Sequence, residues 1–282
     1  MIKYIEDLKV KGIALHSVVP VRAEMREGAE QLTQMLFGET CLIMANGERA
    51  KGESGNWTRI RLDGDGQEGW VDTKMIAPMK EEEYTAYRAA YASAATVSMP
   101  MAFAVSENNS QTIPLTAGTR LTNYKDGRFE VLGVGFRIDP SMVIASPRVL
   151  NLQTLLETTR FFLNVPYLWG GKNALGMDCS GFTQIIMSLF GRRLLRNARE
   201  QVTQGEAVER LQDAQAGDLV FFNHQSPMSN DQSPITHVGL VIDPERVIHC
   251  SGRVKVEKLD EKGIYSAERG MYTHHLVSIR RV

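Results

Sequence analysis

One cysteine of this chain stands where a nucleophile could work. Cys179 lies between Asp178 and Ser180, at the end of a glycine-containing segment that begins at Pro166. Apolar residues with helical spacing follow over residues 182–190, so the cysteine is predicted to open a helix. Free N–H groups and the helix dipole at such an end favour an anion, lower the pKa of a thiol and can hold an oxyanion. The alternative is a small buried side chain, which is common for free cysteine.

Two downstream histidines could serve as the base that a cysteine nucleophile needs. His237 opens an apolar strand-like segment, residues 236–243, and His249 lies in the next one, residues 246–251. Neighbouring strands are about 4.8 Å apart, which places the two side chains within hydrogen-bonding reach. His237 is predicted to be the general base and acid, and His249 to set its tautomer. Structural positions are predicted for the other histidines, His16, His224, His274 and His275.

Short motifs connect these residues with a known family. They are Pro-Tyr-Leu-Trp-Gly-Gly at 166–171, Asp-Cys-Ser-Gly-Phe at 178–182, His-Val-Gly-Leu at 237–240 and Val-Ile-His at 247–249. Together they resemble the NlpC/P60 family of papain-like cysteine peptidases, which cleave peptidoglycan stem peptides, typically at the γ-D-glutamyl–diamino acid bond. The resemblance implies a catalytic triad of Cys179, His237 and His249.

The same resemblance assigns substrate-binding roles around the nucleophile. Tyr167 aligns with a tyrosine whose hydroxyl lies near the oxyanion site, although a tyrosine here could also anchor the loop. Trp169, in the same loop, is a further substrate-binding candidate. Asp178 and Ser180 match positions that help to bind a free N-terminal amine in dipeptidyl-peptidase-like members, and a carboxylate suits that role. Asp178 can also be the N-cap of the helix, and the two roles are compatible.

Two more residues are predicted to line the cleft. The segment Arg196–Gln201 resembles the family's Arg-Asp/Asn-x-x-x-Gln segment, with Asn197 as a substrate-binding candidate. Asn197 and Ala198 stand where some amine-selecting members have Asp and Ser, which weakens the implied selection of a free N-terminus. Glu30, in an early loop of the N-terminal half, is a candidate charge from the other wall, against the alternative of an ordinary exposed charge.

The order of predicted elements indicates an α+β protein with three parts. Residues 148–282 show helices followed by an antiparallel sheet, as expected for a papain-like NlpC/P60 catalytic domain. Residues 1–79 combine an N-terminal arm (1–14) with short strands joined by Gly/Asp turns, among them the alternating segment Trp57–Leu62. These strands resemble a small SH3-like β-barrel of the bacterial type.

Residues 80–147 are predicted to form a helical linker and a second SH3-like β-barrel. The helix carries Tyr84, Tyr87 and Tyr91 on one face, which we interpret as the packing face of a linker in preference to a binding groove. Strand candidates follow, and an Asp-Gly pair at 126–127 indicates a tight hairpin. The pattern is more divergent than that of the first barrel.

Composition excludes several classes of function. Of 282 residues, 32 are Lys or Arg and 33 are Asp or Glu, so the near-zero net charge indicates no nucleic-acid partner. The chain has neither an apolar run of about 18 residues nor an apolar signal segment, so no membrane insertion is expected. The predicted compartment is the cytoplasm, or the periplasm or cell envelope if a leader was removed. Cys41, Cys179 and Cys250 form no C-x-x-C pair, which predicts neither a disulfide framework nor a zinc site. No cofactor, metal or obligate protein partner is predicted.

The combined prediction is a cysteine peptidase that hydrolyses the γ-D-glutamyl–L-diamino acid bond of peptidoglycan stem peptides, particularly short murein peptides with a free N-terminal L-Ala. Cys179 would attack the γ-amide carbonyl, and water would resolve the thioester. One alternative is a cell-wall-binding protein with an inactive peptidase domain, which the presence of Cys179 and His237 disfavours. Another is an amidase or transpeptidase on the same fold. The diamino acid, and whether the barrels bind cell wall or only shape the cleft, stay open.

Overall fold

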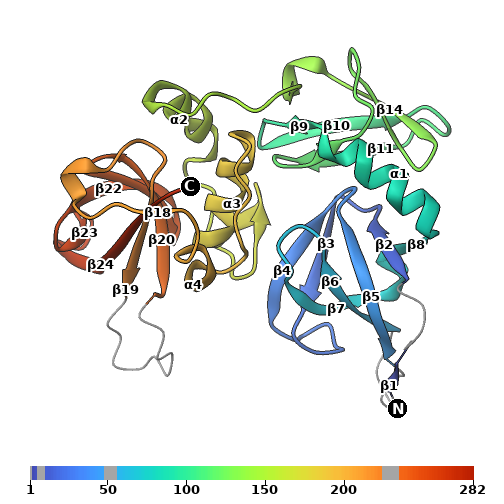
Figure 1. Ribbon diagram of the computed structural model, residues 1–282, viewed down its shortest axis with the longest axis horizontal. Coiled ribbons are helices and arrows are strands. Elements are labelled where there is room, and N and C mark those ends of the chain that lie inside the picture. Colours follow the sequence, from blue (N-terminus) through green and yellow to red (C-terminus); the bar gives the residue numbers. More distant parts are fainter. Residues whose placement is uncertain (1, 5–9, 48–55, 224–234) are drawn as a thin grey trace. The chain divides into compact units, whose positions relative to one another are not determined.

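The computed structural model of the protein describes residues 2–4, 10–47, 56–223 and 235–282. The chain divides into two compact units, Met1–Ser146 and Pro147–Val282 (Figure 1). A further division of the first unit at residue 79 stays a prediction. His224, for which a structural position was predicted, lies outside the described residues.

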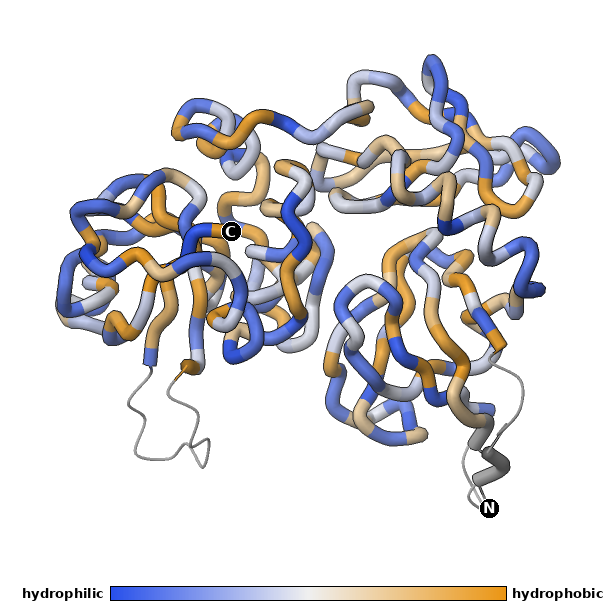
Figure 2. The backbone as a smooth tube through the Cα atoms, in the orientation of Figure 1, coloured by the Kyte–Doolittle hydropathy of each residue, from blue (hydrophilic) through white to orange (hydrophobic). Residues whose placement is uncertain are grey.

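The first part of the N-terminal unit is an antiparallel sheet around a small apolar core. Its strands pair in the order β4-β3-β7-β6-β5-β2-β8, and β1 pairs with β5. Hydrophobic stretches run along these strands (Figure 2), and the core includes Val21, Ile60 and Val71. The strands are β1 (Ile2–Tyr4), β2 (Lys11–Ala14), β3 (Val18–Arg22), β4 (Gln31–Leu36), β5 (Thr40–Gly47), β6 (Trp57–Leu62), β7 (Glu68–Asp72) and β8 (Ile76–Met79), with a 3₁₀ turn at Thr73–Met75.

The prediction of an N-terminal arm is wrong for residues 11–14, which form strand β2 between β5 and β8. Gly12 permits this close pairing, because a Cβ atom at that position would lie 2.6 Å from Cγ2 of Ile76. Ile13 and Ala14 are fully buried. A four-residue strand that starts with lysine and glycine carries little strand propensity, so its pairing depends on the rest of the sheet.

Helix α1 (Glu81–Ala92) joins the sheets of the N-terminal unit. The buried Tyr87 donates its hydroxyl to the carbonyl of Gly38 at 2.9 Å. The hydroxyl of Tyr84 donates to Oδ2 of Asp63, also at 2.9 Å. The tyrosine face therefore packs on the chain itself, in agreement with the interpretation as a linker.

The rest of the N-terminal unit is a second sheet-rich part, as expected for a divergent SH3-like domain. Phe129 is fully buried and stacks on Phe136 with ring centroids 5.1 Å apart. Asp126 and Gly127 have φ values of 49° and 81° and form a tight left-handed turn closed by a single bridge between Lys125 and Arg128. The predicted hairpin is wrong beyond this turn, because β12 and β13 on its two sides belong to different sheets. The strands pair as β11-β10-β14-β13 and β12-β9-β15. They are β9 (Ala95–Val97), β10 (Met101–Ser106), β11 (Thr112–Thr116), β12 (Arg120–Leu121), β13 (Arg128–Val131), β14 (Val134–Ile138) and β15 (Val143–Ile144), with a 3₁₀ turn at Pro140–Met142.

The C-terminal unit is the predicted α+β domain, and its antiparallel sheet closes on itself. The strand order is β18-β24-β19-β20-β21-β22-β23, and β23 also pairs with β24. The strands are β16 (Lys172–Asn173), β17 (Gly176–Met177), β18 (Glu206–Ala207), β19 (Leu219–Asn223), β20 (His237–Asp243), β21 (Arg246–Ser251), β22 (Arg253–Asp260), β23 (Gly263–Ser266) and β24 (Met271–Arg281). The helices are α2 (Leu152–Thr159), α3 (Cys179–Leu189) and α4 (Ala198–Gln201), with 3₁₀ turns at Arg160–Phe162 and Leu211–Asp213.

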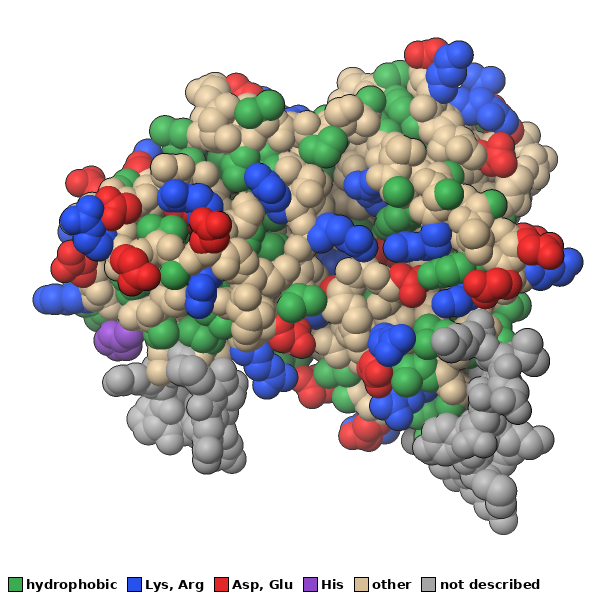
Figure 3. All heavy atoms as spheres, in the orientation of Figure 1, with side chains coloured by type: hydrophobic (Ala, Val, Ile, Leu, Met, Phe, Trp, Pro, Cys, Tyr) green, Lys and Arg blue, Asp and Glu red, His purple; other side chains and the backbone are tan. Residues whose placement is uncertain are grey.

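Helix α3 is the element that carries the predicted nucleophile against this sheet. It packs on β20 and β21, and ten of its residues are buried, among them the polar Ser180, Thr183 and Gln184. Within the described part of the chain, no helix combines the length and apolarity that crossing a membrane requires. Positive and negative side chains are interspersed over the face shown in Figure 3.

Candidate active site

Cys179 occupies the first turn of α3, as predicted. Asp178 is the N-cap and accepts a hydrogen bond from the N–H of Gly181 at 2.7 Å. Gly181 is required here, because a Cβ atom would lie 2.2 Å from the carbonyl oxygen of Gly171 in the preceding loop. The N–H groups of Ser180 and of Val238, at the start of β20, point to the sulfur of Cys179. The helix start and β20 therefore meet at the thiol.

The predicted lowering of the thiol pKa is wrong. Burial, followed by the negative charge of Asp178, raises the pKa of Cys179 to about 12, against the opposing effect of the two N–H groups and Arg196. The side chain is only 8% exposed, so the cost of desolvating a thiolate exceeds what the helix end supplies. The Cys179 thiol therefore keeps its proton at neutral pH.

The β20–β21 hairpin brings the two predicted histidines together. Gly239 of β20 pairs with His249 of β21, which places the His237 and His249 side chains on the same face. Nε2 of His237 lies 2.8 Å from Nδ1 of His249. His249 is fully buried, and this burial lowers its pKa, so the imidazole is neutral. Nε2 is thus the ring nitrogen through which His237 contacts His249, and Nδ1 is the other ring nitrogen.

Asp178 is bound on all sides by the chain itself. Arg196, only 1% exposed, donates Nη1 to Oδ1 at 3.0 Å and Nη2 to Oδ2 at 2.6 Å. The N–H of Gly170 donates to Oδ2 at 2.9 Å, and Ser180 receives a further hydrogen bond from Nη1 of Arg196 at 2.9 Å. Gln201 donates to the carbonyl of Ser180 at 3.2 Å. Arg196 and Gln201, from the segment that resembles the family's cleft motif, thus hold the turn that carries Cys179.

The other predicted substrate-binding residues lie in three places. Tyr167 is half-buried beside Cys179, and burial together with that thiol raises its pKa, so the hydroxyl keeps its proton. Trp169 is 61% exposed in the loop before α3. Asn197 is the N-cap of α4 and binds Oε2 of Glu200 through Nδ2 at 2.9 Å. Glu30 is exposed at the start of β4 in the N-terminal unit, and its role stays a prediction.

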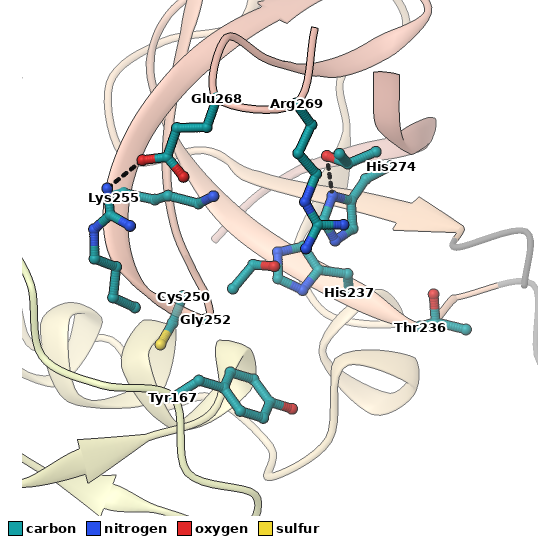
Figure 4. A pocket seen from close by; sticks show the side chains of 12 residues that line it. Tyr167, Thr236, His237, Cys250, Gly252, Lys255, Glu268, Arg269 and His274 are labelled. Atoms are coloured by element: carbon teal, nitrogen blue, oxygen red, sulfur yellow. Dashed lines mark hydrogen bonds and ion pairs between the residues drawn. The ribbon is translucent and has the colours of Figure 1, made fainter. Parts of the chain in front are cut away.

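A cavity of about 470 Å³ adjoins His237 within the C-terminal unit (Figure 4). Three cations, Arg253, Lys255 and Arg269, and one carboxylate, Glu268, line it. Arg253 is paired with Glu268, whereas Arg269 extends toward His237 (Figure 4). The cavity therefore places three cations and one carboxylate around the ring of His237.

Two residues of this site were not predicted. The ring of His274, assigned only a structural position, lies against that of His237 with centroids 4.3 Å apart and also lines the cavity. Oε2 of Glu257 lies 2.9 Å from Nε2 of His249. The sequence signal that could have identified them is a polar side chain at a strand position that faces inward. Glu257 in β22 and His274 in β24 are such positions. That signal is weak without the strand register.

Comparison with known proteins identifies the C-terminal unit. A profile of the NlpC/P60 family matches residues 164–281. The chain is 30% identical over 261 residues to the γ-D-glutamyl-L-lysine dipeptidyl-peptidase of Bacillus subtilis, covering 88% of this chain and 80% of that protein. It is 30% identical over 115 residues to dipeptidyl-peptidase 6 of Lysinibacillus sphaericus, which is 39% of this chain and 37% of that one.

The fold similarity extends over both units. An NlpC/P60 family protein from Bacillus cereus has a solved structure that matches 96% of this chain and 99% of its own, with a TM-score of 0.74 and 18% identity. This level of identity establishes the fold alone, whereas the match to the Bacillus subtilis peptidase covers most of both sequences. The chain therefore belongs to the NlpC/P60 family of peptidases.

Proposed function

We propose that the protein is a cysteine peptidase that hydrolyses the γ-D-glutamyl–L-diamino acid bond of peptidoglycan stem peptides, acting on short peptides with a free N-terminal L-Ala. The observation that carries this proposal is the placement of Cys179 where α3 meets β20, next to the hydrogen-bonded pair of His237 and His249. Similarity to relatives named γ-D-glutamyl-L-lysine dipeptidyl-peptidase and dipeptidyl-peptidase 6 supports the bond and the release of a dipeptide.

Acylation begins with a neutral thiol. Nδ1 of His237 takes the proton of Cys179 as the sulfur attacks the γ-carbonyl carbon, which gives a tetrahedral oxyanion. The protonated hydroxyl of Tyr167 and the N–H groups at the start of α3 are the donors proposed to stabilise that oxyanion. When the C–N bond breaks, His237 returns the proton to the leaving amine, and an L-Ala-γ-D-Glu thioester remains on Cys179.

Deacylation uses the same base. Water gives a proton to Nδ1 of His237 as its oxygen attacks the thioester carbonyl, and the C–S bond then breaks. The proton returns to Cys179, and L-Ala-γ-D-Glu leaves as a free acid. The raised thiol pKa favours this last step, because the resting protein holds the sulfur as S–H.

The roles of Asp178 and of the substrate amine are separated in this proposal. The Asp178 carboxylate already accepts hydrogen bonds from the N–H groups of Gly170 and Gly181 and from both terminal nitrogens of Arg196. We infer that Asp178 holds Arg196 and Ser180 in place and does not itself receive the ammonium. Asn197 has no charge, and Glu30 stays a candidate charge for selection of a free N-terminus.

The cavity beside His237 is proposed to take the leaving diamino acid. The general acid must lie next to the amine that it protonates, so this side of His237 faces the product that leaves first. Arg269 and Lys255 in the wall favour a leaving group with carboxylates. Diaminopimelate carries one more carboxylate than lysine, and the proposed substrate is accordingly L-Ala-γ-D-Glu-diaminopimelate.

Four peptides test this proposal by mass spectrometry of their products. They are L-Ala-γ-D-Glu-diaminopimelate, its N-acetyl derivative, its form with an amidated second carboxylate, and L-Ala-γ-D-Glu-L-Lys. We expect free diaminopimelate and L-Ala-γ-D-Glu from the first, and a kcat/KM lower on the order of tenfold for each of the others, because each lacks one charged contact.

The outcomes separate the parts of the proposal. Equal cleavage of the free and acetylated peptides would remove the selection of a free N-terminus and leave the peptidase. Equal cleavage of the diaminopimelate and lysine peptides would remove the role of the cationic cavity. Cleavage of none of the four would contradict the assigned bond.

A further inference from the structure

A carboxylate ends the hydrogen-bonded series that starts at His237. Nε2 of His237 meets Nδ1 of His249 at 2.8 Å, and Nε2 of His249 meets Oε2 of Glu257 at 2.9 Å. The side chains of His249 and Glu257 are 0% and 7% exposed, so water is largely excluded from both contacts.

This series determines where the protons are. An ionised carboxylate only accepts hydrogen bonds, so Nε2 of His249 carries a proton and donates it to Glu257. In a neutral imidazole the other nitrogen is then an acceptor, so Nδ1 of His249 receives the N–H of Nε2 of His237. The remaining nitrogen of a neutral His237, Nδ1, is then unprotonated. The base described above needs this tautomer of His237.

The strand register explains how Glu257 reaches His249. In the β21–β22 pair His249 is opposite Lys255, so Glu257 lies two residues further along β22 on the same face. Such diagonal neighbours are within reach of a long side chain. Lys255 donates to the same Oε2 atom at 3.1 Å, and Lys255 also lines the cavity beside His237.

We propose that Glu257 is a positioning residue of the peptidase: it fixes the tautomer of His249, and through His249 it keeps Nδ1 of His237 unprotonated for Cys179. This inference rests on the proposed roles of Cys179 and His237. Glu257 touches neither substrate nor sulfur, and no proton moves beyond His237 during the reaction. Its negative charge also stabilises the positive charge that His237 acquires when the thiol is deprotonated.

The charges around the histidine pair act in opposite directions. Burial alone would raise the pKa of Glu257, but hydrogen bonds, of which that from His249 has the largest effect and that from Lys255 a smaller one, lower it to about 2, so the carboxylate is ionised at neutral pH. Lys255 opposes protonation of His249, and Glu257 favours it. The other titratable or charged groups that the structure places around the pair are Cys179 on α3, Cys250 on β21, His274 on β24, Tyr167, Arg269 and the Arg253–Glu268 pair.

The pH profile of kcat/KM distinguishes positioning from a merely structural role. Removal of the Glu257 charge makes the histidine pair harder to protonate, so the acid limb of the profile should move to lower pH in both E257Q and E257A. Removal of the Lys255 charge in K255M should move the acid limb to higher pH. Because the two histidines are coupled, the limb reports an apparent pKa of the pair.

The expected losses of rate differ between the Glu257 variants. E257A should lower kcat on the order of 100-fold with KM nearly unchanged, since the tautomer of His249 is no longer fixed. E257Q keeps an oxygen that can accept the hydrogen bond from His249, so its loss of kcat should be smaller. It thereby distinguishes the loss of the hydrogen-bond acceptor from the loss of charge, and it serves as the second variant if E257A fails to fold. E261Q, an exposed glutamate in the turn after β22, is the matched control and should retain the wild-type profile.

Two results would be decisive against the inference. E257A and E257Q with wild-type kcat and an unmoved acid limb, while C179A is inactive, would overturn the role of Glu257 and leave the peptidase intact. Acid limbs that move in the same direction in E257Q and K255M would also overturn it. Such a result would mean that the shift does not depend on whether a negative or a positive charge is removed, as expected for a loss of packing. Activity that survives in C179A would instead contradict the proposed function itself.

Discussion

Replacement of Cys179 by alanine is expected to lower kcat/KM for L-Ala-γ-D-Glu-diaminopimelate by a factor on the order of 10⁴ or more. The thioester cannot form without the sulfur, and the remaining groups act on a water that nothing positions as a nucleophile. KM should change little, because the small Cys179 side chain is expected to meet only the γ-carbonyl group of the substrate and forms no separate binding pocket. The rate of release of free diaminopimelate, measured by mass spectrometry, checks this prediction.

Cys41 provides the matched control for that variant. It is also fully buried, but it lies in the core of the N-terminal unit. C41A should retain the activity of the wild type and lose at most a modest amount of stability, as expected for a small buried substitution. Equal losses of activity in C41A and C179A would show that both act through the fold, and the assignment of Cys179 as nucleophile would then have to be withdrawn.

The second large effect concerns the buried ion pair behind the nucleophile. R196M should reduce the free energy of unfolding of the C-terminal unit by about 3–5 kcal/mol, because it leaves the Asp178 carboxylate buried without its cation. The two side chains are 1% and 9% exposed, so solvent screens the pair very little. Differential scanning calorimetry of the full chain should show the loss as a lower transition temperature for this unit.

Asp178 allows a variant that separates its charge from its capping role. Asn is as good an N-cap as Asp, so D178N keeps the cap of α3 and removes only the charge. D178N should therefore be about as destabilising as R196M, and the double variant should be more stable than the sum of the two losses implies. Additive losses in the double variant would show that the pair does not act as a unit.

The parts of the site that the sequence predicted are those with a strong local signal. The apolar pattern after Cys179 predicted the helix, and Asp178 is the N-cap that its residue type favours. The two apolar segments around the Asp243 turn predicted a hairpin, and the register of β20 and β21 places His237 beside His249. In each case the residues that determine the geometry are close together in the chain.

The parts that the sequence did not predict depend on burial and on distant pairings. The pKa of Cys179 is raised because the start of helix α3 is buried. This burial depends on distant strands, so the sequence around Cys179 cannot predict it. The sequence alone gives no sign that Arg196 is buried, because arginine is usually a surface residue, but the fold buries it together with Asp178. Glu257 contacts His249 only through the β21–β22 register, and β2 is a strand only because Gly12 lets it approach Ile76.

The most direct test of the central claim is mass spectrometry of the protein after rapid acid quenching during turnover of L-Ala-γ-D-Glu-diaminopimelate. We predict an added mass equal to the L-Ala-γ-D-Glu dipeptide less one water, located by digestion on the peptide that contains Cys179. The adduct should be absent from C179A, and neutral hydroxylamine should remove it, as expected for a thioester. Continued hydrolysis of the peptide by C179A, with no adduct on the wild-type Cys179 at any quench time, would contradict the account.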